Sequence, residues 1–304
     1  MGMLCDLAPI SVVITTFNDL DYLGQAIESV LEQDLVPRQI IVVDDGSHQM
    51  GAEGIVDKYA CNDKSVHVTY FRKDNGGASS ARNLGIRESS FRYVAFLDVD
   101  DQMLPSNLSE KYNLISSLDD GYFGVYGGAL RSTGEEEVFA DIDGVVGVEI
   151  IDCQVKGIPG GAPFYLFSKD ALISVGGFDE SLKCNEDHDL IIRLLKSSKK
   201  CKGSTGIGFY RNIRIGSLSR PVDPFKKFGC VMLFLDKAER NEYYESGILG
   251  YKRMDAYLAL ARELFVKRRV VQAFKFSRMA FKHSKPVTVL QKSVYFFSFS
   301  FLVN

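Results

Sequence analysis

The sequence lacks the residue patterns that bind zinc or build a disulfide framework. Its six cysteines and four histidines are scattered over 304 residues, and no two cysteines form a CxxC pair. Long apolar runs are missing as well. Residues 1–9 do not resemble a signal peptide, and no stretch reaches the roughly 18 apolar residues of a membrane-spanning helix. These absences predict a protein of a reducing, cytoplasmic compartment.

Charge is distributed unevenly along the chain. Residues 1–224 contain 21 Lys and Arg against 33 Asp and Glu, whereas residues 225–304 contain 15 against 6. The acidic N-terminal part does not offer the basic surface that sequence-independent nucleic-acid binding requires, so we expect no nucleic-acid partner. The change of sign follows Pro221 and Pro224 and predicts two domains, 1–224 and 225–304, with different tasks.

The first hundred residues alternate between strand-like and helix-like patterns. Strands are predicted at 10–17, 39–44, 66–71 and 93–98, with helices at 19–33, 51–61 and 78–89. Strands separated by helices of this length pair in parallel, so the pattern predicts an α/β fold with a mostly parallel sheet. Beyond residue 121 the pattern predicts mixed sheet, and residues 225–304 are predicted to be mainly helical.

Polar residues gather where three of the predicted strands end, which is where open α/β sheets bind ligands. The most informative end is residues 96–101, Phe-Leu-Asp-Val-Asp-Asp. The two-residue period places Asp98 and Asp100 on one face, and two hard oxygen ligands side by side suit Mg²⁺ or Mn²⁺ together with a diphosphate. A turn or a helix cap uses the same residue types, so this motif alone leaves both interpretations open.

The other polar segments carry weaker signals. Asp45 could accept a hydrogen bond from a nucleobase, and Phe17 could stack on the same base. Taken alone, however, an Asp at this position more commonly forms an ordinary Asx turn. The glycine-rich segment 75–83 could bring N–H groups and Arg82 to a phosphate, although a helical Arg more often faces solvent. Residues 185–189 open a predicted helix with more acidic residues than a first turn needs. A carboxylate there could take a proton from an attacking hydroxyl.

In this order, the segments resemble the family 2 glycosyltransferases with the GT-A fold. The resemblance covers about residues 8–220 and rests on segments 11–18, 43–47, 77–86, 96–101, 176–180, 186–187 and 210–219. It implies a Rossmann-like, mostly parallel sheet with helices on both faces, followed here by a C-terminal helical extension. It also implies inverting, metal-dependent transfer of a sugar from a nucleotide-diphosphate sugar, with a UDP-sugar as first choice, to a saccharide or lipid-linked acceptor. Bacterial cell-surface polysaccharide synthesis is the family's usual setting.

The resemblance assigns roles to individual residues. Asp187 is implied as the catalytic base and Asp100 as the ligand of Mg²⁺ or Mn²⁺. The donor nucleotide and its diphosphate are expected at Thr15, Phe17, Asn18, Asp45, Arg82, Asp98 and Asp100. Glu186 and Arg214 are expected on the acceptor or diphosphate side. Many relatives carry a histidine where this chain has Arg214. Because arginine cannot ligate a metal, we expect weak metal binding in the absence of donor.

The basic part, residues 225–304, interleaves its cations with aromatic side chains. This pattern predicts peripheral contact with the cytoplasmic face of the inner membrane. Packing on the acidic body or homodimerisation would explain it equally well.

Two alternative functions remain open from the sequence. A nucleotidyltransferase shares a related architecture, but its glycine-rich loop with Arg and Lys is absent after the first strand. A catalytically silent nucleotide-sugar-binding scaffold would have no reason to keep Asp45, Asp98, Asp100 and Asp187 together.

Overall fold

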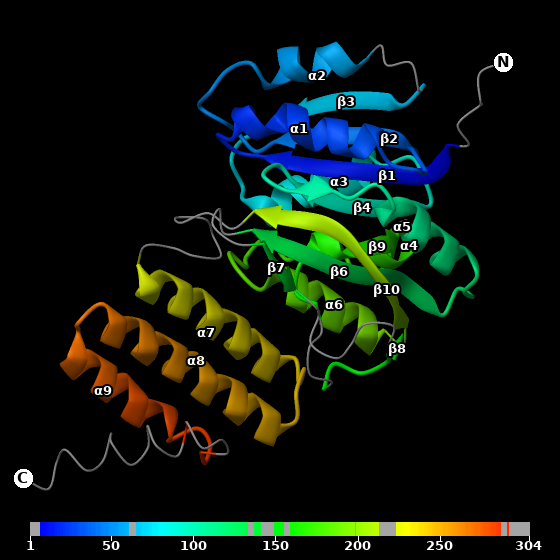
Figure 1. The fold of residues 1–304 in the computed structure, drawn as a ribbon. Helices are drawn as coiled ribbons and strands as arrows, with labels where there is room; N and C mark the ends of the chain where they lie inside the picture. The colour runs from blue at the N-terminus through cyan, green and yellow to red at the C-terminus, as the bar shows by residue number, and fades with distance from the viewer. Residues whose placement is uncertain are drawn as a thin grey trace, which may run out of the picture. The chain divides into compact units, whose positions relative to one another are not determined.

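The structure is a computed structural model that describes residues 7–60, 65–132, 137–140, 149–154, 159–197, 199–212, 223–286 and 291. The chain divides into two compact units, Met1–Ile213 and Arg214–Asn304 (Figure 1). The domain boundary predicted at residue 224 falls inside the second unit, where its first described helix begins.

A ten-stranded sheet forms the centre of the first unit. Its strands are β1 (Ala8–Thr16), β2 (Pro37–Asp44), β3 (His67–Arg72), β4 (Tyr93–Asp98), β5 (Gln102–Met103), β6 (Tyr122–Ser132), β7 (Glu137–Ala140), β8 (Glu149–Ile150), β9 (Tyr165–Ser168) and β10 (Lys200–Asn212). The order along the sheet is β3-β2-β1-β4-β9-β6-β10-β5, with β7 beside β6 and β8 beside β10. The neighbours β3, β2, β1 and β4 are parallel, as predicted, and antiparallel pairs appear from β9 onward.

Helices cover both faces of this sheet. They are α1 (Leu20–Leu31), α2 (Ala52–Ala60), α3 (Ala78–Glu88), α4 (Asn107–Ser116), α5 (Lys169–Ser174) and α6 (Glu186–Lys196), with a short 3₁₀ turn, η1 (Ala162–Phe164). Val12 of β1 faces a core built with α1, α2 and α4. Its neighbour Val13 points to the opposite face, where α3 packs so closely that a Cβ on Gly85 would lie 2.2 Å from Val13 Cγ1. The predicted α/β fold with two helical layers is confirmed.

Three helices make up the described part of the second unit: α7 (Pro224–Arg240), α8 (Ser246–Val266) and α9 (Val270–Ala280). Leu260, Leu264 and Ala273 form a small core with three aromatic rings packed against it. Along the described parts of the chain, no helix is both long and apolar enough to cross a membrane. The aromatic residues at 295–303, which are part of the segment 225–304 predicted to contact the membrane, lie outside the described residues.

Candidate active site

The carboxyl ends of β1, β2 and β4 bring the predicted polar segments to one edge of the sheet. Thr15, which is half-buried, pairs with Val43 of β2 on one side and with Asp98 of β4 on the other. The backbone N–H of Asp45 donates to the carbonyl of Thr16 at 3.0 Å. The three strand ends therefore meet, as the alternating pattern predicted.

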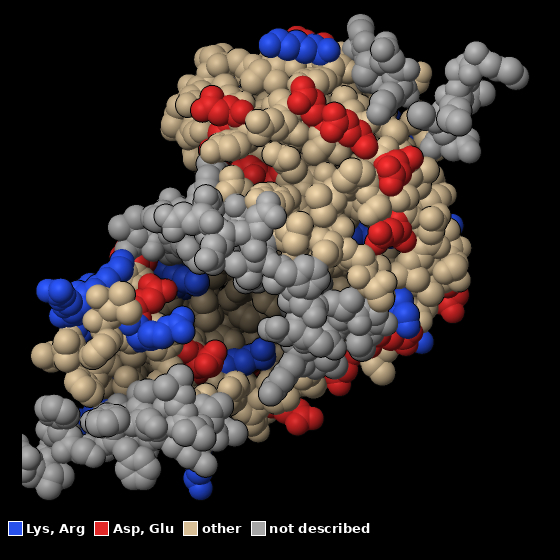
Figure 2. Space-filling model, in the orientation of Figure 1, with Lys and Arg blue, Asp and Glu red and all other residues tan. Residues whose placement is uncertain are grey.

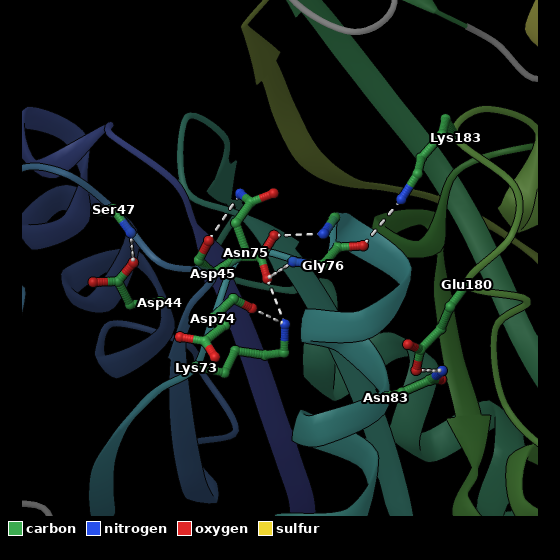
Figure 3. A network of polar contacts seen from close by, with 11 residues as sticks. Asp44, Asp45, Ser47, Lys73, Asp74, Asn75, Gly76, Asn83, Glu180 and Lys183 are labelled. Atoms are coloured by element: carbon green, nitrogen blue, oxygen red, sulfur yellow. Dashed lines mark hydrogen bonds and ion pairs between the residues drawn. The ribbon is translucent and has the colours of Figure 1, made fainter.

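Asp45 holds the glycine-rich loop that leads into α3 (Figure 3). One carboxylate oxygen accepts from the Lys73 ammonium at 2.8 Å and from the Gly76 N–H at 3.0 Å, and the other accepts from the Gly77 N–H at 2.7 Å. The carbonyl of Asp45 accepts from the Asn75 side chain. Asp45 is 4% exposed. Two of the N–H groups expected to face a phosphate therefore donate to Asp45 instead.

The loop after β1 is fastened to the loop after β2. Asn18 adopts a left-handed conformation with φ 58°. Its N–H donates to the Ser47 hydroxyl, and its side-chain oxygen accepts from the His48 N–H, both at 2.8 Å. Phe17 is 43% exposed and makes an edge contact with the His48 ring. An exposed ring on a fixed loop is suited to stacking on a flat ligand.

Arg82 is buried at the centre of a cluster of three carboxylates. Its guanidinium donates to Asp98 at 2.9 Å, to Glu186 at 3.1 Å and to Asp187 at 3.3 Å. The side chain is only 5% exposed and lies over the Phe178 ring. The network joins the end of β4, the second turn of α3 and the first turn of α6. Carboxylates that are 16, 104 and 105 positions from Arg82 in the sequence therefore meet at one cation.

One guanidinium does not neutralise three carboxylates. Burial raises the pKa of Asp187 to about 8; Arg82 opposes this shift, while Glu186 and Asp98 add to it. Burial alone would lower the pKa of Arg82, but the three carboxylates outweigh it and raise that pKa above its ordinary value. A raised pKa on Asp187 suits a group that must accept a proton near neutral pH.

Two further carboxyl groups, Asp100 and Asp101, follow Asp98 at the end of β4 and bear on the predicted metal site. Asp101 is 3% exposed and accepts from the Asn212 N–H at 3.0 Å. Burial, together with the charges on Asp98 and Asp100, raises the pKa of Asp101 to about 8. Hard oxygen donors that repel one another fit a divalent cation such as Mg²⁺ or Mn²⁺. Among the described residues, no group of three or more Asp, Glu, His or Cys side chains is arranged to hold a metal ion by itself.

Several residues of the site escaped prediction, most of them because their backbone partners are distant in the sequence. The Asn83 side chain exchanges hydrogen bonds with the backbone of Phe178 at 2.8 and 2.9 Å. Arg193 pairs with buried Asp189 and donates to the carbonyls of Val175 and Gly177. The four-residue spacing of Asp189 and Arg193 was the available signal for this pair. Together these contacts fix the 175–178 turn between α3 and α6.

Arg214 and segment 216–219, which were predicted to take part in the site, lie outside the described residues. A hollow of about 370 Å³ lies near Asp44 and Tyr70 and is lined by none of the predicted site residues.

Comparison with known proteins agrees with the resemblance seen in the sequence. Residues 11–141 match the family model described as Glycosyl transferase family 2. An uncharacterised glycosyltransferase of Rickettsia typhi is 32% identical over 199 residues, covering 62% of this chain and 59% of the relative. One of Rickettsia felis is 29% identical over 203 residues, covering 64% of this chain and 32% of the relative. The chain thus spans about a third to three-fifths of the length of these curated relatives.

Solved structures share the fold. Staphylococcus aureus TarS 1–349 in complex with UDP-GlcNAc superposes with a TM-score of 0.64 at 19% identity, covering 95% of this chain and 79% of TarS. The mannosyltransferase PcManGT of Pyrobaculum calidifontis, in complex with GDP-Man and Mn²⁺, gives a TM-score of 0.64 at 14% identity and covers 98% and 84%. At such identities the likeness concerns the fold alone, and it confirms the predicted GT-A architecture.

Proposed function

Because residues 11–141 match the model of glycosyl transferase family 2, we propose that the protein transfers a sugar, with inversion, from a nucleotide-diphosphate sugar to a hydroxyl group. The donor proposed first is a UDP-sugar carrying a hexosyl or hexosaminyl group. The acceptor is a saccharide or a lipid-linked saccharide.

The Arg82 network carries this proposal. It ties Asp98, at the strand end where the donor diphosphate is expected, to Glu186 and Asp187 at the start of α6. A base for the acceptor hydroxyl and a carboxylate for the donor therefore share one buried cation. Inverting transfer needs these two functions on either side of one anomeric carbon.

The donor is proposed to bind along the strand ends. Phe17 would stack on the base, with Thr15 and Asn18 beside the ribose, while Asp45 holds the loops in place. Mg²⁺ or Mn²⁺, bound by Asp100 with Asp98 beside it, would stabilise the charge of the departing diphosphate. Arg214 and Glu186 are proposed on the diphosphate and acceptor sides.

Asp187 is proposed as the general base. Its carboxylate takes the proton of the acceptor hydroxyl, and the acceptor oxygen forms its bond to the anomeric carbon. The bond from that carbon to the diphosphate oxygen breaks, and the nucleoside diphosphate leaves with the electron pair. One displacement inverts the anomeric configuration, and no covalent sugar-enzyme intermediate forms.

The names of relatives suggest the setting. One is a putative teichuronic acid biosynthesis glycosyltransferase of Bacillus subtilis, and another is the poly(ribitol-phosphate) beta-N-acetylglucosaminyltransferase TarP of Staphylococcus aureus. TarP is 27% identical over 212 residues, covering 66% of this chain and 62% of TarP. We extend these names to a role in bacterial cell-surface polysaccharide synthesis at the cytoplasmic face of the inner membrane.

A donor screen tests the proposal. The full chain is incubated with UDP-, GDP-, TDP- and CMP-linked sugars, each with Mg²⁺, Mn²⁺ or EDTA, and free nucleotide is measured. We expect slow release of nucleoside diphosphate from one donor class, dependent on the cation. A parallel incubation contains a nucleoside triphosphate and a sugar phosphate. Release of pyrophosphate there would instead identify a nucleotidyltransferase. Donor binding without release under any condition would favour the silent scaffold.

A further inference from the structure

The turn between α8 and α9, residues 265–271, exposes apolar side chains next to basic ones. Its exposed apolar residues are Phe265 (60%), Val266 (76%), Val270 (42%) and Val271 (84%). The three residues between them, 267–269, are Lys-Arg-Arg and are all exposed. Figure 2 shows Lys and Arg gathered beside uncharged side chains at the left edge of the view, where Figure 1 places this turn.

These apolar side chains are not needed by the core of the second unit. The core lies one helical turn away, at Leu260, Leu264 and Ala273, and it is completed by aromatic rings from α7 and α9. Four exposed apolar residues within seven positions therefore leave a free apolar surface at the tip of a helical hairpin.

Arg268 occupies a backbone position that favours glycine. Its φ is 59°, and the N–H groups of Arg268 and Arg269 donate to the carbonyls of Phe265 and Leu264 at 2.9 and 2.8 Å. This is the Schellman arrangement that ends a helix, and glycine usually fills its left-handed position. An arginine side chain is therefore present where glycine would be less strained, and it lies within the basic run 267–269.

The charge around the turn is mainly positive, and Glu263 is the acidic residue nearest to it in the sequence. Residues 264–282 contain six Lys and Arg and no Asp or Glu. A convex tip with exposed apolar side chains flanked by cations matches a bilayer surface, where anionic headgroups attract the cations and the interface accepts the apolar groups.

We propose that the α8–α9 turn is the membrane-docking site of this chain, and that its partner is a bilayer containing anionic phospholipid. Phe265, Val266 and Val271 enter the interface, while Lys267 and Arg268 lie at the lipid phosphates. This inference does not rest on the proposed glycosyl transfer, since docking needs neither donor nor acceptor.

Vesicle flotation of the full chain tests the site. We expect the protein to float with phosphatidylcholine vesicles that contain phosphatidylglycerol, to remain behind with phosphatidylcholine alone, and to be released by salt. The double variant Phe265→Ser with Val271→Ser should bind at least ~10-fold more weakly. A control away from the turn, Lys227→Gln with Leu233→Ser, removes one charge and one exposed apolar residue from α7 and should bind like the wild type.

Arg268→Gly separates docking from folding. Each basic residue near an anionic surface strengthens binding about fivefold, so this variant should bind about fivefold more weakly. Because glycine relieves the left-handed strain, its Tm should equal or exceed that of the wild type. Binding unchanged in both turn variants, or lost equally in the α7 control, would overturn the proposal. Light scattering provides a further test. If the wild type is a dimer and the double variant Phe265→Ser with Val271→Ser is a monomer, the turn is a subunit interface and the proposal is overturned.

Discussion

The surroundings of Asp45 and the surroundings of Arg82 lie at the same edge of the sheet but balance buried charge in opposite ways. Around Asp45, one carboxylate receives an ammonium and two backbone N–H groups. Around Arg82, one guanidinium serves three carboxylates. The first arrangement is nearly saturated and holds loops in place. The second keeps excess negative charge, which a proton or a divalent cation can relieve, and chemistry is therefore expected there.

Removal of Arg82 should have the largest effect on stability. Arg82→Met leaves Asp98, Glu186 and Asp187 without their shared cation, and loss of one partner of a buried ion pair costs about 3–5 kcal/mol. We expect the low end of that range, since Asp98 is 36% exposed. Urea denaturation at neutral pH measures the loss. Arg82→Lys, which keeps the charge, should lose less, and equal midpoints for both variants would show that charge is not what Arg82 contributes.

Asp187→Asn should have the largest effect on turnover. If Asp187 accepts the acceptor proton, its amide cannot, and kcat should fall by at least ~10²-fold while donor affinity is retained. Steady-state kinetics and donor titration measure the two quantities separately. Unchanged turnover would remove Asp187 from the role of base.

Glu186→Gln is the matched control for Asp187→Asn. It removes a carboxylate from the same guanidinium without removing the proposed base, so its kcat should fall far less.

The pH profile of the wild type gives a second check on Asp187. Because the base acts when deprotonated and burial raises the pKa of Asp187 to about 8, wild-type kcat/KM should rise with pH toward that value. A profile that is flat between pH 6 and roughly 9 would contradict this assignment.

The sequence predicted the strand ends but not how their charges are shared. Continuous apolar strands and intervening helices sufficed to bring Thr15, Asp45 and Asp98 to one edge, because parallel strands present their carboxyl ends together. The Asp45 carboxylate points toward the 73–77 loop because of the path that this loop takes. The alternation of polar and apolar residues, which predicted the strands and helices, does not predict the path of a loop. Arg82 was expected to face a nucleotide, but its three partners depend on how α3, β4 and α6 pack, and these contacts span up to 105 residues.

Asp45→Asn should show the opposite kinetic pattern to Asp187→Asn. An amide cannot accept from Lys73, Gly76 and Gly77 at once, and an unsatisfied buried donor costs about 1–3 kcal/mol. We expect a lower Tm and a higher KM for the donor, with kcat within a few-fold of wild type. If kcat falls as far as in Asp187→Asn, Asp45 takes part in the reaction and the contrast between the two surroundings fails.

The smallest effect is expected where the 175–178 turn supports the Arg82 cluster. Gly176 and Gly177 both have positive φ, 77° and 70°, so alanine costs about 1 kcal/mol at either position from backbone strain alone. A Cβ at Gly176 meets nothing within 4 Å, whereas one at Gly177 would lie 2.4 Å from Asn83 Oδ1.

Gly177→Ala should therefore displace Asn83 and weaken its bonds to Phe178, the ring beneath Arg82. We expect it to be about 1 kcal/mol less stable than Gly176→Ala, and turnover should fall only in Gly177→Ala. Thermal unfolding and kinetics of the pair measure this difference, in which the shared strain cancels. Identical values for the two variants would mean that the Arg82 cluster does not depend on Asn83, and that the excess charge there is held by α3 and α6 alone.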